Sequence, residues 1–156
     1  MKGIINTKDN CIIQVGLIVK NVEKSKVKWA EFLGCQVPAT VGAGEYEVTQ
    51  TVYKGKKAPK AACKMAFFDV GNNMQMELIE PNGKKSTWQD FLDKHGEGIH
   101  HIAFKVKGTD KVLKTCSDAG YKCIQRGKYG DASGEYAYLD TGKDLKCIVE
   151  FLESYG

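Results

Sequence analysis

One pattern of a strand followed by a helix occurs twice in this chain, and the repeat limits the folds that are open to it. Its first copy is CIIQVGLIVKNVEKSKVKWAEFLG, residues 11–34. The spacing of apolar residues predicts a strand over about 11–20, a helix N-cap at Asn21 and an amphipathic helix ended by Gly34. A strand and the helix that covers it therefore open the first half.

The second copy is GIHHIAFKVKGTDKVLKTCSDAG, residues 98–120. The same spacing predicts a strand over about 98–107, a cap at Thr109 and a helix ended by Gly120. The two halves of the chain thus begin alike.

The two halves also end alike, because MAFFDVGNNMQMELIE (65–80) overlays YAYLDTGKDLKCIVEFLE (136–153). Each stretch has a strand, a short turn that contains glycine and a second strand, which is the pattern of a hairpin. With one more strand between helix and hairpin, each half is a βαβββ module, over about 12–80 and about 98–153. We therefore predict an internal duplication of two such modules.

A separate helix is predicted between the modules, over about 86–95 in KKSTWQDFLDKHGEG. Ser86 with Gln89 forms the pattern of a capping box, and Gly96 stops the helix. His95 then lies in the last turn, where the terminal carbonyl groups favour a cationic or polar side chain. This position explains His95 without a role in chemistry.

The other two histidines are adjacent, in GIHHIAFKV. Neighbouring side chains of a strand point to opposite faces of the sheet. His100 is therefore expected on the face of Ile102 and Phe104, which helices would cover. His101 is expected on the other face, beside the small side chain of Ala103.

Four polar residues share that second face. The repeat places Gln14 at the position equivalent to His101, and Glu77 at the position equivalent to Glu150. A polar residue between apolar neighbours of a strand costs free energy unless it has a partner. Two carboxylates, an amide oxygen and an imidazole suit one divalent metal ion such as Ni²⁺, Co²⁺, Zn²⁺, Fe²⁺ or Mn²⁺. The alternative is that they are half-buried polar residues satisfied by their neighbours.

The paired modules, GIHHIAFKV and the closing strands MELIEP and VEFLE resemble the vicinal oxygen chelate superfamily over essentially the whole chain. This family includes glyoxalases, bleomycin resistance proteins and ring-cleaving dioxygenases. The resemblance implies a single α+β domain over 1–156, in which two tandem βαβββ modules form a curled mixed sheet with a concave metal site. It places the metal ligands on the first and last strands of each module, at Gln14, Glu77, His101 and Glu150.

Two enzyme families within it are similar to this chain. The ligand set resembles that of glyoxalase I (lactoylglutathione lyase). The chain is most similar to methylmalonyl-CoA epimerases in two segments, FLDKHGEGIHHIAFKV and GNNMQMELIEP. Those enzymes typically have histidine in the first ligand position and often glutamine in the second. This chain has Gln14 and Glu77 at these positions.

Both resemblances imply proton removal beside a metal-chelated carbonyl and formation of an enediolate. They imply Glu150 as the base and Glu77 as its counterpart. In an epimerase, Glu45 or Glu47 would be a candidate for a further acid or base, but an exposed strand or loop is expected for both.

The substrate is left open by the sequence. Glyoxalase I enzymes hold the carboxylates of glutathione with arginines near the first and third ligand strands, whereas Arg126 is the only arginine here. The favoured hypothesis is an isomerase or lyase of the glyoxalase I type that acts on another thiol adduct or small carbonyl compound. The alternative enzyme is a methylmalonyl-CoA epimerase. A non-catalytic binding protein of the bleomycin-resistance type is the third.

Composition excludes other classes of function. The net charge of +4 comes from lysines spread along the chain, without the arginine clusters typical of nucleic-acid binding. No apolar run has the length of a membrane span or of the apolar part of a signal peptide, so we expect a cytoplasmic protein. Because disulfides form in oxidising compartments, we expect its six cysteines to be free thiols. The family resemblance implies a homodimer.

Overall fold

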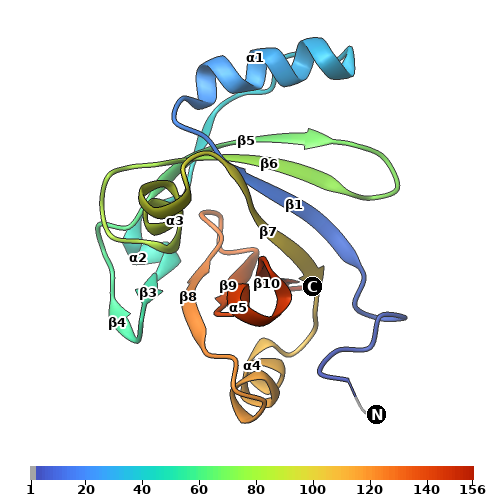
Figure 1. The fold of residues 1–156 in the computed structure, drawn as a ribbon, viewed down its shortest axis with the longest axis vertical. Helices are drawn as coiled ribbons and strands as arrows, with labels where there is room; N and C mark the ends of the chain where they lie inside the picture. Colours follow the sequence, from blue (N-terminus) through green and yellow to red (C-terminus); the bar gives the residue numbers. More distant parts are fainter. Residues whose placement is uncertain (1–2) are drawn as a thin grey trace.

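The computed structural model describes residues 3–156, and ten strands of the chain form one curled sheet (Figure 1). The first module contains β1 (Ile12–Ile18), α1 (Val22–Leu33), β2 (Val41–Gly42), β5 (Cys63–Asp69) and β6 (Gln75–Pro81). The second contains β7 (Gly98–Lys105), α4 (Thr109–Asp118), β8 (Cys123–Lys128), β9 (Gly134–Leu139) and β10 (Ile148–Ser154). The linker helix is α3 (Thr87–His95). The α+β fold with paired βαβββ modules is confirmed.

The two modules meet through their first strands, which pair within one chain. The order of the sheet is β2-β5-β6-β1-β7-β10-β9-β8-β3-β4, with β1 and β7 antiparallel at its centre. Each of these strands has the closing strand of its own module as its other neighbour, in parallel. The first and last strands of both modules, which carry the predicted ligands, are therefore four adjacent strands.

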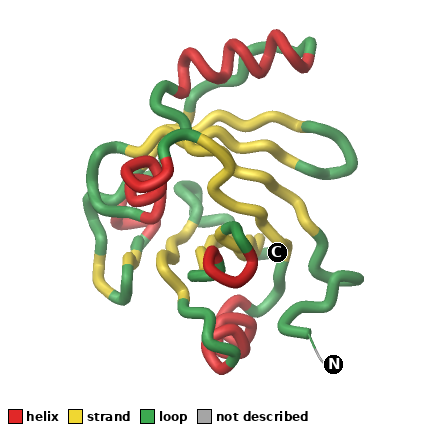
Figure 2. Tube along the Cα trace, viewed as in Figure 1, coloured by secondary structure: helices red, strands yellow, loops and turns green. Residues whose placement is uncertain are grey.

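A segment of the first module crosses to the second. It contains α2 (Tyr46–Thr49), β3 (Val52–Tyr53) and β4 (Lys56–Lys57), and β3 pairs with β8 at the far edge of the sheet. The strand predicted between helix and hairpin in the first module is only the two-residue β2. Because the crossing segment joins β2 at one edge to β3 near the other, it spans the opening of the curled sheet (Figure 2).

The two faces of the sheet have different coverings. Helix α1 packs on the outer face, where it contacts Phe68 and Leu78, and α4 packs there against Phe151. Helix α3 lies against the inner face, where Trp88 contacts Ile79 and Tyr138. The final turn of the second module contains the short helix α5 (Gly142–Leu145). No helix within residues 3–156 has the length and apolarity needed to cross a membrane.

The helix caps agree with the sequence in part. The Asn21 side chain accepts from the amide of Lys24, and Gly34 ends α1 with φ of 67°. Ser86 accepts from the amide of Gln89, but the Gln89 side chain turns to the amide of Gly83 instead of completing a capping box.

The predicted cap at Thr109 is wrong, because Thr109 is already the first residue of α4. A distant carboxylate replaces the local cap. Glu153 of β10 accepts from the amides of Gly108 at 3.1 Å and Thr109 at 2.8 Å. Its repeat equivalent, Glu80, accepts from the amide of Val22 at 3.0 Å. In both modules the closing strand thus caps the helix that follows the first strand.

Candidate functional site

A β-bulge in β7 lies at the centre of the candidate site. Along β1, Gly16 faces His101 and Leu17 faces Ile99, so His100 is an extra residue without a partner on β1. A bulge interrupts the alternation of side chains and redirects them. His100 is buried against α3, with Nε2 3.2 Å from Thr87 Oγ1. The prediction that His100 lies on the outer face with Ile102 and Phe104 is therefore wrong, because strict alternation does not hold at a bulge.

The imidazole of His101 is completely buried and lies over Gly16. A β-carbon built on Gly16 would be 2.0 Å from Cε1 of His101, far inside van der Waals contact. Only a residue without a side chain leaves space for the ring here. The glycine of β1 thus sets the position of the histidine of β7.

The structure brings the four predicted ligand residues together around one atom, Nε2 of His101. Gln14 Oε1 lies 2.9 Å from this nitrogen, Glu150 Oε2 2.7 Å and Glu77 Oε1 3.6 Å. All four residues have exposed fractions of 7% or less. The Gln14 amide nitrogen donates to Gln75 Oε1 at 2.6 Å, which orients its oxygen toward the histidine.

Burial and charge change the protonation of this cluster. Burial, with the nearby charge of Glu150, raises the pKa of Glu77 to about 8, although His101 opposes the change. Burial alone would lower the pKa of His101, but the charge and hydrogen bond of Glu150 and the charge of Glu77 raise it. The cluster therefore holds protons at neutral pH that the same groups would release in water.

The four donors suit a divalent ion in kind. First-row metals bind imidazole nitrogen and carboxylate oxygen at about 2.0–2.2 Å, so neighbouring donors of one ion lie roughly 3 Å apart. Within the described chain, Glu150 Oε2 is buried with no hydrogen-bond partner beyond its contact with His101. No three His, Cys, Asp or Glu side chains of residues 3–156 are arranged as a ready metal site.

Aromatic residues that the sequence analysis missed form the wall beside the cluster. The Tyr138 ring lies 5.3 Å from that of His101, and the Tyr138 hydroxyl accepts from Trp88 Nε1 at 2.9 Å. The ring of Tyr136 lies 5.3 Å from that of Tyr138, at an angle of 55°. Their spacing of two residues in YAYL was the available signal, because it places both on the face of a strand that carries the site.

The remaining acidic and histidine candidates lie outside the cluster. Glu45 is an exposed loop residue directly before α2, as expected, whereas Glu47 is exposed within the short α2 instead of in a strand or loop. His95 is exposed in the last turn of α3, as predicted, with its ring 4.9 Å from that of Phe91.

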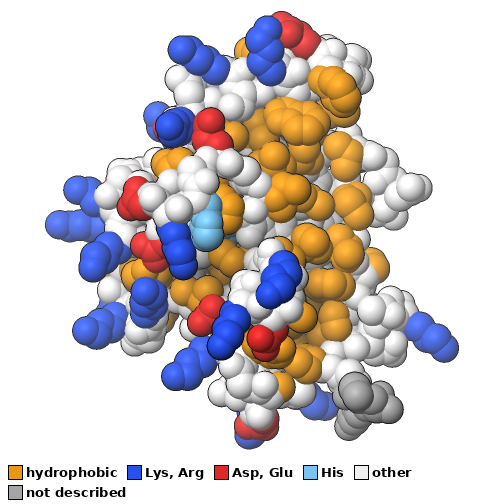
Figure 3. Space-filling view, in the orientation of Figure 1, with side chains coloured by type: hydrophobic (Ala, Val, Ile, Leu, Met, Phe, Trp, Pro, Cys, Tyr) orange, Lys and Arg blue, Asp and Glu red, His pale blue; other side chains and the backbone are white. Residues whose placement is uncertain are grey.

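A groove of about 1480 Å³ ends at His100, beside the cluster, and none of the four clustered residues lines it. It lies between α3, the start of β8 and α5, and it reaches Thr87 and His100. Charged residues of both signs line this groove, which we call the lysine groove: five lysines (Lys54, Lys94, Lys122, Lys143 and Lys146) and three aspartates (Asp90, Asp93 and Asp140). Figure 3 shows basic side chains on this part of the surface with acidic ones between them, beside an apolar expanse over β1 and β7.

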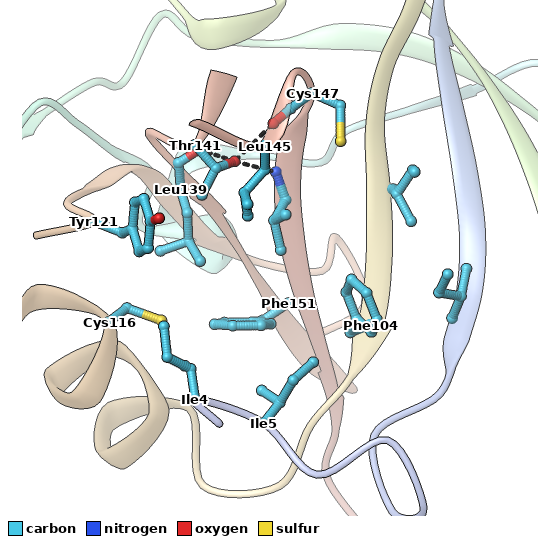
Figure 4. Close-up of a pocket in the computed structure, with 13 residues that line it drawn as sticks. Ile4, Ile5, Phe104, Cys116, Tyr121, Leu139, Thr141, Leu145, Cys147 and Phe151 are labelled. Atoms are coloured by element: carbon cyan, nitrogen blue, oxygen red, sulfur yellow. Dashed lines mark hydrogen bonds between the residues drawn. The ribbon is translucent and has the colours of Figure 1, made fainter. Parts of the chain in front are cut away.

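A second cavity, of about 300 Å³, lies on the outer face and has a different character. Figure 4 shows Ile4, Ile5, Phe104 and Phe151 around it. The Thr141 hydroxyl at its edge already donates to the Cys147 carbonyl and accepts from the Val149 amide, both at 2.8 Å. This cavity therefore offers apolar packing and no chemistry.

Arg126 is fully engaged in ion pairs. Its guanidinium lies 2.7 Å from Asp110 and 2.6 Å from Glu135. It is thus held on the surface between α4 and β9. All six cysteines are free thiols, as predicted.

Comparison with known proteins agrees with this fold. Residues 13–138 match the family model described as the glyoxalase/bleomycin resistance protein/dioxygenase superfamily. An uncharacterized Bacillus subtilis protein, YqjC, is 34% identical over 93 residues, which cover 59% of this chain and 66% of that protein, just under two thirds. The mitochondrial methylmalonyl-CoA epimerase of Dictyostelium discoideum is 26% identical over 140 residues, 89% of this chain and 75% of that protein.

Solved structures give the same picture. Methylmalonyl-CoA epimerase from Mycobacterium tuberculosis has a TM-score of 0.67 at 19% identity, covering 93% of this chain and 88% of its own. A variant of the Streptomyces coelicolor epimerase in complex with 2-nitronate-propionyl-CoA has a TM-score of 0.66 at 19% identity, covering 93% and 97%. At these identities the likeness establishes a shared fold.

Proposed function

Because the chain belongs to the glyoxalase/bleomycin resistance protein/dioxygenase superfamily, we propose that it is an epimerase that moves the proton beside the carbonyl of an acyl-CoA thioester. The observation that carries the proposal is the pair of buried carboxylates, Glu77 and Glu150, that both approach Nε2 of the buried His101. Epimerisation needs a proton removed from one face of a carbon and another delivered to the opposite face. One carboxylate from each module meets this need.

Gln14, Glu77, His101 and Glu150 would hold one divalent ion, which is Ni²⁺, Co²⁺, Zn²⁺, Fe²⁺ or Mn²⁺. Such an ion, when bound, polarises the substrate carbonyl and stabilises the negative charge that develops on its oxygen. None of the four donors is a thiolate, and nitrogen and oxygen donors suit these metals.

The two carboxylates have different tasks. Glu150 removes the proton beside the carbonyl, as general base. Glu77, the carboxylate of the other module, would return a proton to the opposite face of the same carbon. The buried surroundings exclude water, which strengthens each of these interactions.

The lysine groove favours an acyl-CoA over a glutathione adduct. Coenzyme A carries several phosphate charges, and five lysines line the groove that ends at His100. The carboxylates of glutathione would need a free arginine in the familiar mode, whereas Arg126 is bound by Asp110 and Glu135.

A second candidate is an isomerase or lyase of the glyoxalase I type, acting on a thiol adduct other than that of glutathione. The observation in its favour is the glutamate at position 77, where epimerases often have glutamine. In this reaction the proton returns to the neighbouring carbon, so the skeleton of the product differs from that of the substrate.

Proton exchange in heavy water separates these functions. Metal-loaded protein is incubated with methylmalonyl-CoA, other 2-branched acyl-CoAs and hemithioacetals, and the α-proton is followed by NMR. We expect deuterium at the α-carbon of an acyl-CoA without a change of skeleton, and loss of exchange by about 100-fold or more in Glu150→Gln. Inertness of every acyl-CoA, with turnover of a hemithioacetal, would establish the second candidate instead.

The third hypothesis, a non-catalytic binding protein, makes a different prediction. Such a protein would bind its ligand equally well in wild type and Glu150→Gln, with no proton exchange in either. The homodimer implied by the family resemblance is tested by light scattering of the eluting protein.

A further inference from the structure

Two buried imidazoles contact each other at the centre of the candidate site. His100 Nδ1 lies 2.9 Å from His101 Nδ1, and the two rings are nearly perpendicular at 87°. Adjacent residues of a regular strand cannot meet in this way, because they point to opposite faces. The bulge at His100 makes the contact possible.

The surroundings of His101 assign different tasks to its two nitrogens. Nε2 faces the oxygens of Gln14, Glu77 and Glu150. Nδ1 has only His100 as its hydrogen-bond partner within residues 3–156. A histidine that binds a metal through one nitrogen donates the N–H of the other to an acceptor, which fixes the orientation of the ring.

His100 can be that acceptor in only one tautomer. Its Nδ1 accepts a hydrogen bond if its proton is on Nε2, and Nε2 lies 3.2 Å from Thr87 Oγ1, which can accept the hydrogen bond of that N–H. The Thr87 amide is itself held by Gln125 Oε1 at 2.9 Å. In this tautomer His101 donates a hydrogen bond to His100, and His100 donates one to Thr87.

The ring of His100 is also held mechanically. It has an exposed fraction of 1% and lies edge-on to Phe91 at 5.3 Å and to Tyr138 at 5.1 Å. Rotation of the ring would meet one of these aromatic side chains. The hydrogen-bond acceptor offered to His101 is therefore stationary.

We propose that His100 is a positioning residue: its Nδ1 accepts the Nδ1–H of His101 and holds Nε2 of His101 toward the other three ligands. The inference rests on the proposed function, because it concerns the nitrogen that would bind the metal. Strict strand alternation would place His100 on the opposite face and exclude this role. The proposal also gives a role to Thr87 of the linker helix, which fixes the tautomer of His100.

Three substitutions of His100 separate hydrogen bonding from packing. His100→Asn places an amide oxygen close to the position of Nδ1 and keeps the acceptor. His100→Gln places its amide close to the position of Nε2, so it keeps the contact with Thr87 but removes the acceptor. His100→Phe keeps the ring and removes both hydrogen bonds.

The first readout is affinity for Zn²⁺ and Co²⁺, measured by competition with a chelator. We expect affinity to fall about 10–100-fold in His100→Phe and His100→Gln, with His100→Asn remaining within about threefold of wild type. Wild-type affinity in His100→Phe would overturn the proposal, as would an equal loss in all three variants. Circular dichroism and thermal melting confirm that each variant is folded.

The second readout needs no metal. In chelator-treated wild type labelled with ¹⁵N-histidine, we expect a slowly exchanging imidazole proton that couples to the ring nitrogens of the histidine pair. It should be lost in His100→Phe. Its absence from the wild type would overturn the role of His100 even if metal binds. If the wild type binds no metal but shows this proton, the proposed function fails while the hydrogen bond between the histidines stands.

Discussion

The imidazole of His101 lies across Gly16, its partner on the neighbouring central strand, with only 2.0 Å between Cε1 and the place where a β-carbon would be. The contact joins the first strands of the two modules at the candidate site. Any side chain at position 16 must displace the ring, and the ring is enclosed on all sides because His101 is 0% exposed.

Gly16→Ala is therefore expected to lower both stability and metal affinity. Overpacking of a buried site costs about 1–3 kcal/mol, and the displaced ring would no longer point Nε2 at the other ligands. Gly42→Ala is the matched control, because a β-carbon there meets nothing within 4 Å. Equal unfolding midpoints for the two variants in urea would contradict the close packing at Gly16.

The pH dependence of stability tests the protons held in the cluster. The pKa of Glu77 is raised to about 8 from 4.5, and that of His101 is raised as well. The folded protein then binds more protons than the unfolded chain. This contribution to stability is fully present below about pH 4.5 and is lost as the pH rises through about 8, at roughly 1.4 kcal/mol for each pKa unit as an upper limit.

We thus expect the melting temperature of chelator-treated protein to fall between pH 5 and 8, and to fall less in Glu77→Gln. Added metal should reverse the trend, because metal binding requires unprotonated ligands and strengthens as the pH rises. Parallel pH profiles for wild type and Glu77→Gln without metal would show that Glu77 is not the group responsible.

The carboxylate caps give a prediction in acid. The hydrogen bonds from Thr109 and the amide of Gly108 lower the pKa of Glu153, so its stabilisation is present above its unfolded pKa and is lost as the pH falls through the folded value. Glu153→Gln should cost about 1 kcal/mol at neutral pH and less below pH 4, as is typical of helix caps. Glu47→Gln, on an exposed residue, is the control, and an equal loss there would argue against the cap.

The lysine groove makes a kinetic prediction about the substrate. Charge reversal at Lys94 and Lys143 should raise KM for an acyl-CoA about tenfold or more with little change in kcat, because in the proposed function these residues would bind the phosphates and not the reacting carbon. A short thioester without phosphates should react equally with both proteins. Lys28→Glu, on α1 and outside the groove, controls for net charge, and an equal effect there would remove the groove from substrate binding.

The sequence predicted the modules well because their pattern is repeated, and each repeat confirms the boundaries of the other. It also placed Gln14, Glu77, His101 and Glu150 on one face, where their side chains meet around Nε2 of His101. It failed at His100, where a bulge depends on pairing between two distant strands and leaves no local signal. The cap at Thr109 failed for a similar reason, because Glu153 reaches α4 from a strand 44 residues away.

The crossing of α2, β3 and β4 to the second module was also outside the reach of sequence patterns. Strands of two residues are too short to show an alternation of apolar and polar residues. The pairing of β3 with β8 depends on the free edge of the sheet, which the sequence does not reveal. The wall of Tyr136 and Tyr138 had a signal in its spacing, but its proximity to His101 follows only from the order of the strands.

The metal content of the purified protein tests the central claim most directly. Wild type and His101→Ala are loaded with Ni²⁺, Co²⁺ or Zn²⁺, dialysed and measured by mass spectrometry. We predict about one tightly bound ion per chain in the wild type and none in the variant. A wild type that retains no metal under any loading would contradict the account and leave the cluster as a buried hydrogen-bonded network.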